Sequence, residues 1–308
     1  MTLRIGTRGS ALALAQANDV ARRLEACGHS TAIEVISTTG DRVVDRTFAE
    51  VGAFGVFVRE IESALVEGRV DVAVHSYKDL PSTGPSELAI TAVPERVDAA
   101  DILLAPASAL TGEGLIPLRQ GARIGTASAR RRALLHHFRP DLAIELLRGN
   151  VPTRLRAITE GRFDAIVLAA AGLYRLQRSK AELPSLDAAG IVVTRLDPSQ
   201  YVPAPSQGAV AVQTRRDDAV TCAAVASIND ARTTRALAAE RGALARAEAG
   251  CTLPFGAWCR VLDDDRLSLI AVMADEHGVL ARAEATGHDP DALAEQVWRQ
   301  IAPGRATP

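Results

Sequence analysis

Two short motifs occur twice in this chain, in the same order, and this internal repeat constrains the fold more than any other feature. The motif RIGT begins at Arg4 and again at Arg123, followed each time by small residues, arginines and an apolar helical pattern. The motif EGRxD, with any residue at x, begins at Glu67 and again at Glu160 and precedes a short apolar run. One such match can arise by chance, but two matches in the same order favour a duplicated unit. We therefore expect two α/β domains of the same kind that face a common cleft, where binding sites often lie.

The first copy begins with a strand over residues 3–6, followed by a turn and a helix. Ser10 suits the N-cap position of this helix. Backbone N–H groups of a first helical turn attract anions, so the turn that contains Arg8 and Ser10 is a candidate anion site. The elements expected next are a strand over 33–37, a glycine-rich segment over 51–55 and a helix over 56–67.

Residues 68–81 read GRVDVAVHSYKDLP and combine a buried strand with an abrupt polar end. The apolar run over 70–74 is typical of a strand in a parallel sheet. Its carboxyl end carries Ser76, Lys78 and Asp79, and open α/β sheets bind their ligands at this end of their strands. Solvated charges at a strand exit are the alternative interpretation of these residues.

Arginines gather in the second copy, although the formal net charge of the whole chain is only −2. Guanidinium groups bind carboxylates and phosphates with two hydrogen bonds at once, so we expect a focused positive site. A surface salt bridge is the alternative for any single arginine. The residues at or just after the expected strand ends are Thr126, Ser128, Arg130, Arg131, Arg148, Asn150, Arg154, Gly172 and Arg175, the last two after a strand over 165–169.

The pattern changes after Arg215, where we expect a small α+β domain. It is reached through a strand over 191–196, a proline-fixed crossover (PAPSQG) that contains Gln207, and a strand over 209–213. The elements expected beyond it are helices over 219–228, 231–247 and 290–301 and strands over 257–262, 267–273 and 279–286. The expected domains are domain 1 over residues 1–98 and 198–216, domain 2 over 99–197 and domain 3 over 217–308.

The composition is that of an ordinary globular protein, with 47% hydrophobic and 23% charged residues. Near-neutral charge and only 4% aromatic residues argue against nucleic-acid binding. No apolar run has the length of a signal peptide or a membrane span. The four cysteines lack CxxC spacing, which argues against a zinc site or a disulfide framework. We therefore expect a cytoplasmic protein without a metal or membrane and, because no long apolar surface stripe is evident, a monomer.

Six motifs in the chain, in their order and spacing, resemble the porphobilinogen deaminase family, whose members are also called hydroxymethylbilane synthases. They are GTRGSALALAQ, VDVAVHSYKDLP, GTASARRR, LRGNVPTRL, PSQGA and EAGCTLPFGA. The resemblance implies two periplasmic-binding-protein-like α/β domains and a third domain, in which Cys251 holds a dipyrromethane cofactor by a thioether. It also implies a transferase of tetrapyrrole and haem biosynthesis. Four porphobilinogen molecules would be joined head to tail on the cofactor with release of ammonia, and hydrolysis would then free hydroxymethylbilane.

The same resemblance assigns roles to individual residues. Asp79 matches the catalytic aspartate, whose carboxylate would stabilise the azafulvenium cation left when porphobilinogen loses ammonia and would also move protons. Each substrate brings an acetate and a propionate group, which explains why so many cations are needed. The residues implied to bind cofactor and substrate, or to pack beside them, are Arg8, Ser10, Phe57, Ser76, Lys78, Thr126, Ser128, Arg130, Arg131, Arg148, Asn150, Arg154, Gly172, Arg175 and Gln207.

Other residues depart from the family pattern or receive no binding role. Glu50 and Phe54 stand where relatives often have lysines, which puts in doubt the screening of product carboxylates by this loop. Without the family, Cys251 would be interpreted as a small buried hydrophobe. Among the others, Cys27, Cys222 and Cys259 are expected to be packing residues, Arg132 and Arg156 solvated charges, and His75 and Tyr77 structural supports.

Two other classes of function compete with this interpretation. A bilobal anion-binding protein without catalysis would explain the arginines, but not an absent export signal or a third domain with a cysteine. A phosphate- or nucleotide-handling transferase would also use arginine-rich turns, but no GxxxxGK[ST] or GxGxxG motif is present. Consumption of porphobilinogen, followed with Ehrlich's reagent, distinguishes the family function from both.

Overall fold

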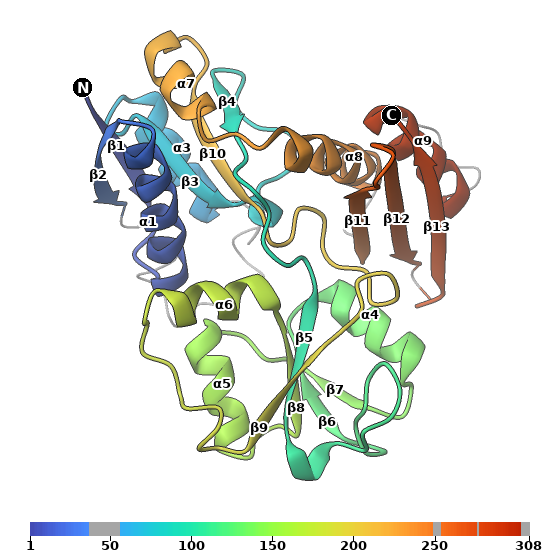
Figure 1. Cartoon of the computed structure of the whole chain (residues 1–308). Coiled ribbons are helices and arrows are strands. Elements are labelled where there is room, and N and C mark those ends of the chain that lie inside the picture. The colour runs from blue at the N-terminus through green and yellow to red at the C-terminus, as the bar shows by residue number, and fades with distance from the viewer. Residues whose placement is uncertain (37–55, 249–253, 276, 303–308) are drawn as a thin grey trace. The chain divides into compact units, whose positions relative to one another are not determined.

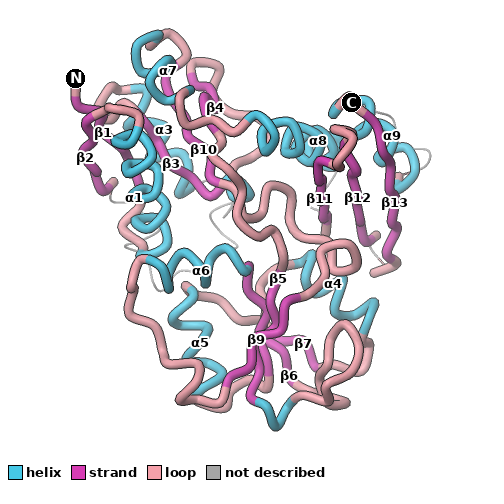
Figure 2. Tube along the Cα trace, viewed as in Figure 1, coloured by secondary structure: helices cyan, strands magenta, loops and turns pink. Residues whose placement is uncertain are grey.

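The computed structural model describes residues 1–36, 56–248, 254–275 and 277–302, which form three β-sheets with their helices (Figures 1 and 2). The chain divides into two compact units. The first unit comprises Met1–Val97 and Gly208–Arg235, and the second comprises Asp98–Gln207 and Ala236–Pro308. Within the described ranges, no helix is long and apolar enough to cross a membrane. The domain boundaries expected from the sequence stay a prediction.

The first unit contains a five-stranded sheet in the order β2-β1-β3-β10-β4. Strands β1, β2 and β3 are parallel, and β10 runs antiparallel to β3 and to β4. Side chains from alternate positions of β1, β3 and β10 pack against α1 and α7 on one face, and α3 covers the other. The strands are β1 (Thr2–Thr7), β2 (Ser30–Val35), β3 (Val72–Ser76), β4 (Leu88–Ala92) and β10 (Val210–Arg215); the helices are α1 (Ala11–Ala26), α3 (Val56–Val66) and α7 (Ala219–Ala226), with a 3-10 turn at Tyr77–Asp79.

The second unit contains a five-stranded sheet of the same design, in the order β7-β6-β8-β5-β9. Figure 1 shows α4 on one face of this sheet and α5 and α6 on the other, and the apolar side chains of the strands alternate between the two faces accordingly. The strands are β5 (Asp101–Pro106), β6 (Arg123–Gly125), β7 (Ala143–Glu145), β8 (Ala165–Ala169) and β9 (Ile191–Arg195); the helices are α4 (Ala129–Phe138), α5 (Val151–Thr159) and α6 (Ala170–Arg178), with a 3-10 turn at Ala107–Ala109.

The structure confirms the internal repeat and shows its physical basis. In each sheet the strand that holds RIGT pairs in parallel with the strand that follows EGRxD. The Asp71 N–H donates to the Arg4 carbonyl (2.9 Å), and the Arg4 N–H donates to the Asp71 carboxylate (3.0 Å). The Asp164 N–H donates to the Arg123 carbonyl (2.9 Å), and the Arg123 N–H returns a bond to the Asp164 carboxylate (2.8 Å). The two motifs are therefore partners of one another, and their repeated aspartates are structural.

The C-terminal part of the second unit is a three-stranded antiparallel sheet in the order β11-β12-β13. Helices α8 and α9 pack on it around a core that includes Leu269, Val297 and Trp298. Its elements are α8 (Ala231–Glu248), β11 (Phe255–Val261), β12 (Leu267–Ala274), β13 (Leu280–Gly287) and α9 (Pro290–Ile301). The expected fold class, two α/β domains and a small α+β C-terminal domain, is confirmed.

Two local expectations were wrong, and two strands were not expected. Strand β3 begins at Val72 and continues through His75 and Ser76, because β10 pairs with it as far as Ser76. The sequence patterns did not identify β4, the edge strand that pairs with β10, or β5, which lies between β8 and β9. Residues 172–175 lie inside α6 and not at a strand end, because the helix begins directly after the last residue of β8.

Candidate functional site

Asp79 lies at the carboxyl end of the buried strand β3, as the sequence predicts. The strand passes into the 3-10 turn Tyr77–Asp79, which is closed by a hydrogen bond from the Leu80 N–H to the Tyr77 carbonyl (3.2 Å). The Asp79 side chain is exposed, and Lys78 beside it is half-buried. The turn therefore presents a carboxylate on a short, well-anchored segment instead of a long loop.

The turn before α1 lies next to this strand end in the same sheet, since β1 pairs with β3. Ser10 caps α1 by accepting a hydrogen bond from the Ala13 N–H (3.3 Å), as expected, and Arg8 is half-buried. Gln16, which was not expected from the sequence, is only 3% exposed on α1. Its side-chain amide exchanges hydrogen bonds with the Ser76 hydroxyl (2.9 and 3.1 Å) and so fixes the end of β3. A polar residue among the alanines of a buried helical face was the signal that could have revealed it.

His75 is buried in β3, before the turn that carries Asp79. Its Nε2 lies 3.1 Å from Gln213 Oε1, and the Gln213 amide in turn donates to Glu62 Oε1 (3.0 Å). Burial lowers the pKa of His75 to about 4, although the hydrogen bond with Gln213 acts in the opposite direction. The imidazole is therefore neutral at pH 7, which suits the supporting role expected for it.

The low pKa of His75 predicts a defined acid sensitivity. In the unfolded chain His75 takes up a proton below about pH 6.5, whereas in the folded protein it does so only near pH 4. The free energy of unfolding therefore decreases as the pH falls from 6.5 to 4, and the contribution of His75 is complete above pH 6.5. The expected contribution is about 3 kcal/mol. In urea unfolding at pH 7 and pH 4, His75→Gln should show a smaller loss of stability on acidification than the wild type. The exposed His288 gives the control variant His288→Gln; an unchanged pH dependence in His75→Gln would contradict the prediction.

Arg130 and Arg131 in the second unit are buried, with 6% and 5% of their surface exposed. They lie in the first turn of α4, where Ser128 is the N-cap and accepts a hydrogen bond from the Arg131 N–H (3.3 Å). Both guanidinium groups form ion pairs with Asp101, at 2.8 and 2.7 Å. The alternative of a surface salt bridge is therefore wrong for these two arginines.

Asp101, the first residue of β5, is fully buried and was not identified from the sequence. Burial by itself would raise the pKa of this carboxyl, but the charges of Arg130 and Arg131 and hydrogen bonds from Arg131 and Gln207 hold its pKa well below its usual range. Gln207, also buried, donates to Asp101 Oδ1 (2.9 Å) and to the Ala99 carbonyl (2.8 Å). The available signal was a charged residue at the start of the apolar run DILLA.

Arg154 extends the positive charge of this cluster. Its Nε donates to the Gly149 carbonyl (2.8 Å), which turns the side chain back over the start of α5. Partial burial and the nearby charge of Arg131 both lower the pKa of Arg154. Two guanidinium groups within electrostatic reach of each other indicate a place that favours an anion.

Other expected binding residues of the second unit have local structural contacts. Asn150 is the N-cap of α5 and accepts a hydrogen bond from the Thr153 N–H (2.9 Å), and Thr126 Oγ1 accepts one from the Ser128 N–H (3.2 Å). Arg148 is exposed, as are Arg132 and Arg156, which were expected to be solvated.

Gly172 occupies the place in the second unit that Asp79 occupies in the first. Ile5 pairs with Val72, and Ile124 pairs with Ala165, so Val72 and Ala165 hold equivalent positions in the two sheets. Asp79 and Gly172 each follow seven residues after these positions. Gly172 is buried in α6, and Arg175 one turn further on is half-buried. The repeat thus carries a carboxylate at this position in one copy only.

Several expected site residues fall outside what the structure describes. Cys251, Glu50 and Phe54 lie outside the described residues, and Phe57 belongs to α3 without a described side chain. Of the cysteines expected to pack, Cys259 is buried in the C-terminal core and Cys222 is half-buried in α7, with its thiol 3.3 Å from the Arg215 carbonyl. Cys27 is exposed, so the packing expectation was wrong for it, because it follows the last turn of α1.

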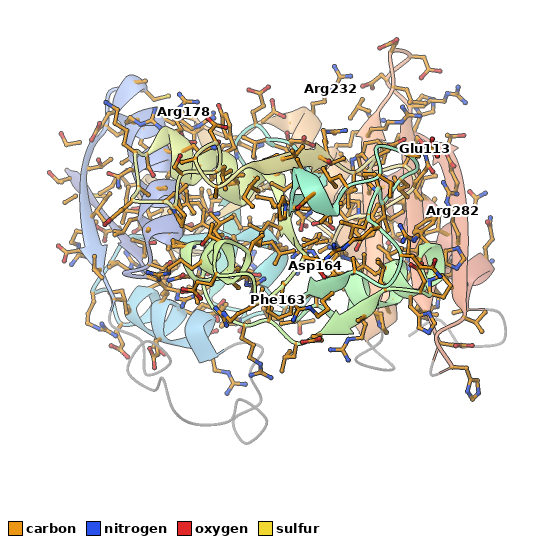
Figure 3. The ribbon with its side chains drawn as sticks, turned by 90° about the horizontal axis from the view of Figure 1, so that it is seen from below. Glu113, Phe163, Asp164, Arg178, Arg232 and Arg282 are labelled. Atoms are coloured by element: carbon orange, nitrogen blue, oxygen red, sulfur yellow. The ribbon has the colours of Figure 1, made fainter. Side chains whose placement is uncertain are left out.

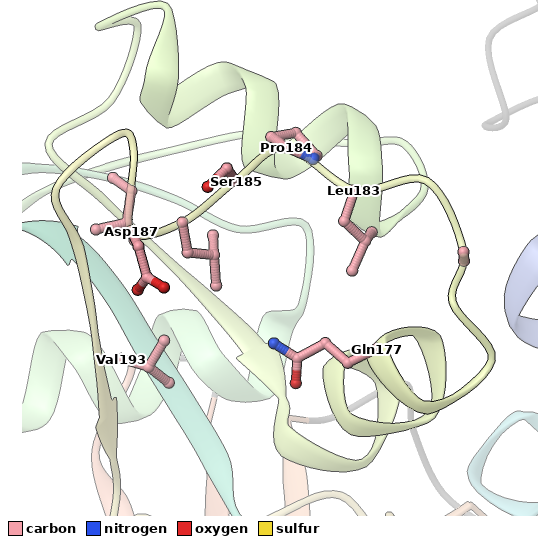
Figure 4. Close-up of a pocket in the computed structure, with 9 residues that line it drawn as sticks. Gln177, Leu183, Pro184, Ser185, Asp187 and Val193 are labelled. Atoms are coloured by element: carbon pink, nitrogen blue, oxygen red, sulfur yellow. The ribbon is translucent and has the colours of Figure 1, made fainter.

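A pocket of about 560 Å³ opens in the second unit between α6, β9 and the segment that joins them (Figure 4). Leu183, Leu186 and Val193 line it together with Asp187, which is its only ionisable residue. A ligand rich in carboxylates needs cations and would be repelled by Asp187, so this pocket does not fit one. The arginine cluster, made of Arg130, Arg131 and the nearby Arg154, does fit, because it holds three guanidinium groups against the single carboxylate of Asp101.

Two family models match the chain: porphobilinogen deaminase, dipyromethane cofactor binding domain, over residues 3–223, and porphobilinogen deaminase, C-terminal domain, over residues 234–302. The porphobilinogen deaminase of Syntrophobacter fumaroxidans is 41% identical over 302 residues, covering 97% of this chain and 92% of the relative. That of Acidothermus cellulolyticus is 44% identical over 297 residues, covering 94% and 85%. Among solved structures, an ancestral arginine-binding protein bound to arginine gives a TM-score of 0.38 at 15% identity, covering 74% of this chain and 90% of the other.

Proposed function

Since this chain belongs to the porphobilinogen deaminase family, we propose that Asp79 is its catalytic residue and that Cys251 anchors its dipyrromethane cofactor. The function of the chain is the stepwise head-to-tail joining of four porphobilinogen molecules on this cofactor, with release of ammonia and final hydrolysis to hydroxymethylbilane. The enzyme is a transferase of tetrapyrrole biosynthesis. The observation that carries this conclusion is the match of both family models along the chain, at residues 3–223 and 234–302.

Asp79 acts on the aminomethylpyrrole that loses ammonia. A carboxylate that accepts a hydrogen bond from the pyrrole N–H stabilises the positive charge that develops on the ring as the amine leaves. The short 3-10 turn supports this role, because it holds the backbone of Asp79 at the end of β3 and so limits how far the carboxylate must move when the charge appears. The same group takes up a proton when the new bond between two rings is complete.

The cations of each unit bind the carboxylates of cofactor and substrate. Arg130, Arg131 and Arg154 form a positive cluster around the Asp101 carboxylate, which fits the carboxylates of both the cofactor and the substrate. When bound, the cofactor supplies the free pyrrole carbon to which the first substrate is joined. The proposed binding residues are Arg8, Ser10, Phe57, Ser76, Lys78, Thr126, Ser128, Arg130, Arg131, Arg148, Asn150, Arg154, Gly172, Arg175 and Gln207.

We also propose that the enzyme works as a cytoplasmic monomer without nucleic-acid partners. Its formal net charge of −2 and 4% aromatic residues support the absence of a nucleic-acid surface. Three domains, over residues 1–98 with 198–216, 99–197 and 217–308, are proposed to carry the catalytic aspartate, the arginine cluster and the attachment cysteine.

A direct assay tests the function. The purified protein is expected to consume porphobilinogen, followed with Ehrlich's reagent, and to release ammonia in equal amount, because each joining step loses one amine. Heat-denatured protein is the control for loss of substrate without catalysis. Binding of porphobilinogen without its consumption would contradict the function and favour an anion-binding protein.

A further inference from the structure

A single carboxylate in the second unit holds two buried guanidinium groups at once. Asp101 Oδ2 accepts a hydrogen bond from Arg130 Nη2 (2.8 Å), and Asp101 Oδ1 accepts one from Arg131 Nη2 (2.7 Å). The opposite ends are also fixed, since Arg130 Nη1 donates to the Val202 carbonyl and Arg131 Nη1 to the Val167 carbonyl, both at 2.8 Å. A planar guanidinium held at both terminal nitrogens has a set orientation.

The charges of this cluster do not balance. Two arginines and one aspartate leave one net positive charge among groups that are at least 94% buried. Among the residues that the structure describes, the Nε atoms of Arg130 and Arg131 are both buried without a hydrogen-bond partner. A buried donor without an acceptor is unfavourable, and the net positive charge of the cluster favours the approach of one more carboxylate.

Gln207 holds the carboxylate from a further direction. Its amide donates to Asp101 Oδ1 and to the Ala99 carbonyl, and it adds no charge to the cluster. Oδ1 therefore has two donors, Gln207 and Arg131, and the carboxylate cannot rotate without breaking bonds to both.

We propose that Asp101, held by Gln207, is a positioning residue that orients Arg130 and Arg131 to bind a carboxylate of the pyrrole chain. Because it neutralises only one of the two guanidinium groups, one positive charge remains for the ligand. This inference rests on the proposed role of these arginines in binding carboxylates. The substitution Asp101→Asn would keep the shape of the side chain but leave one oxygen to accept hydrogen bonds from two guanidinium groups. The amide N–H₂ group, itself a donor, would face the second guanidinium group. One arginine would then lose its orientation, and the bound carboxylate would lose a charge-assisted hydrogen bond.

The test compares Asp101→Asn with Asp164→Asn in the cofactor-bearing enzyme. Asp164, labelled in Figure 3, is a matched control in the same unit, because it is also paired with two arginines, Arg119 (2.7 Å) and Arg123 (3.7 Å). It precedes β8, whereas Asp101 pairs with the last residue of that strand. The probe is a porphobilinogen analogue in which a methyl group replaces the aminomethyl group, so that it keeps both carboxylates but cannot react. Calorimetric titration gives its Kd, and thermal unfolding reports on the fold.

Asp101→Asn is expected to raise the Kd of the analogue about tenfold or more, whereas Asp164→Asn should change it less than about twofold even if its unfolding temperature falls. A folded Asp101→Asn protein with the wild-type Kd would overturn the proposal. If Asp101→Asn does not fold, Gln207→Met answers the same question: about a threefold rise in Kd is expected, and an unchanged Kd refutes the positioning role. Arg131→Gln tests the proposed carboxylate-binding role of the arginines separately from the positioning role of Asp101. An unchanged Kd in that variant would contradict the role of the arginines.

Discussion

Asp79→Asn is expected to fold like the wild type and to lose porphobilinogen turnover by about 100-fold or more. The amide keeps the size of the side chain and can still accept a hydrogen bond from a pyrrole N–H. It carries no charge to stabilise the cation that forms when ammonia leaves, and it cannot take up a proton at neutral pH. The measurement is the initial rate of porphobilinogen consumption at saturating substrate, with circular dichroism as the check of folding.

Asp263→Asn is the matched control, because it makes the same chemical change at an exposed aspartate between β11 and β12. Its turnover should equal that of the wild type. Near-normal turnover in Asp79→Asn would remove Asp79 from the chemistry and leave it as a surface charge at a strand end.

Cys251→Ser is expected to abolish activity by removing the proposed attachment point of the cofactor. A serine hydroxyl is far less nucleophilic than a thiolate and should not form the bond to the pyrrole methylene group. The intact mass of the wild-type protein should exceed that of the bare chain by one dipyrromethane, and this increment should be absent from Cys251→Ser.

Cys27→Ser is the control for the loss of an accessible thiol, since Cys27 is exposed. It should keep both the mass increment and the activity. An increment that persists in Cys251→Ser, or a fully active wild-type preparation without one, would show that the cofactor is attached elsewhere or not covalently.

The repeat shows how much of the fold the sequence determines. RIGT and EGRxD were recognised as repeated motifs, and the structure adds that the two motifs bind each other in both copies, through Arg4 with Asp71 and Arg123 with Asp164. Elements with strong local patterns agree closely with expectation: β8 (Ala165–Ala169) and α9 (Pro290–Ile301) have the expected bounds. Strands β4 and β5 were not identified, although they are at least as long as β8, because neither carries a repeated motif and their places in the sheets depend on distant partners.

The site also combines residues that a local sequence pattern predicts with residues that depend on distant partners. Asp79 could be placed at the end of a buried strand from the sequence alone, because the change from apolar to polar residues is local. Asp101 could not, because its partners Arg130, Arg131 and Gln207 lie 29, 30 and 106 residues away along the chain. Gln16 likewise contacts Ser76 across 60 residues.

The sequence by itself therefore determined the repeated α/β architecture, the family and those candidate site residues, such as Asp79, that lie in a recognisable local motif. Only the tertiary structure decided which charges are buried and paired, and so distinguished the buried Arg130 and Arg131 from their exposed neighbour Arg132. The physical reason is that periodicity along a chain reports which face of an element is apolar, whereas the burial of a charge depends on counter-charges that the fold brings from elsewhere.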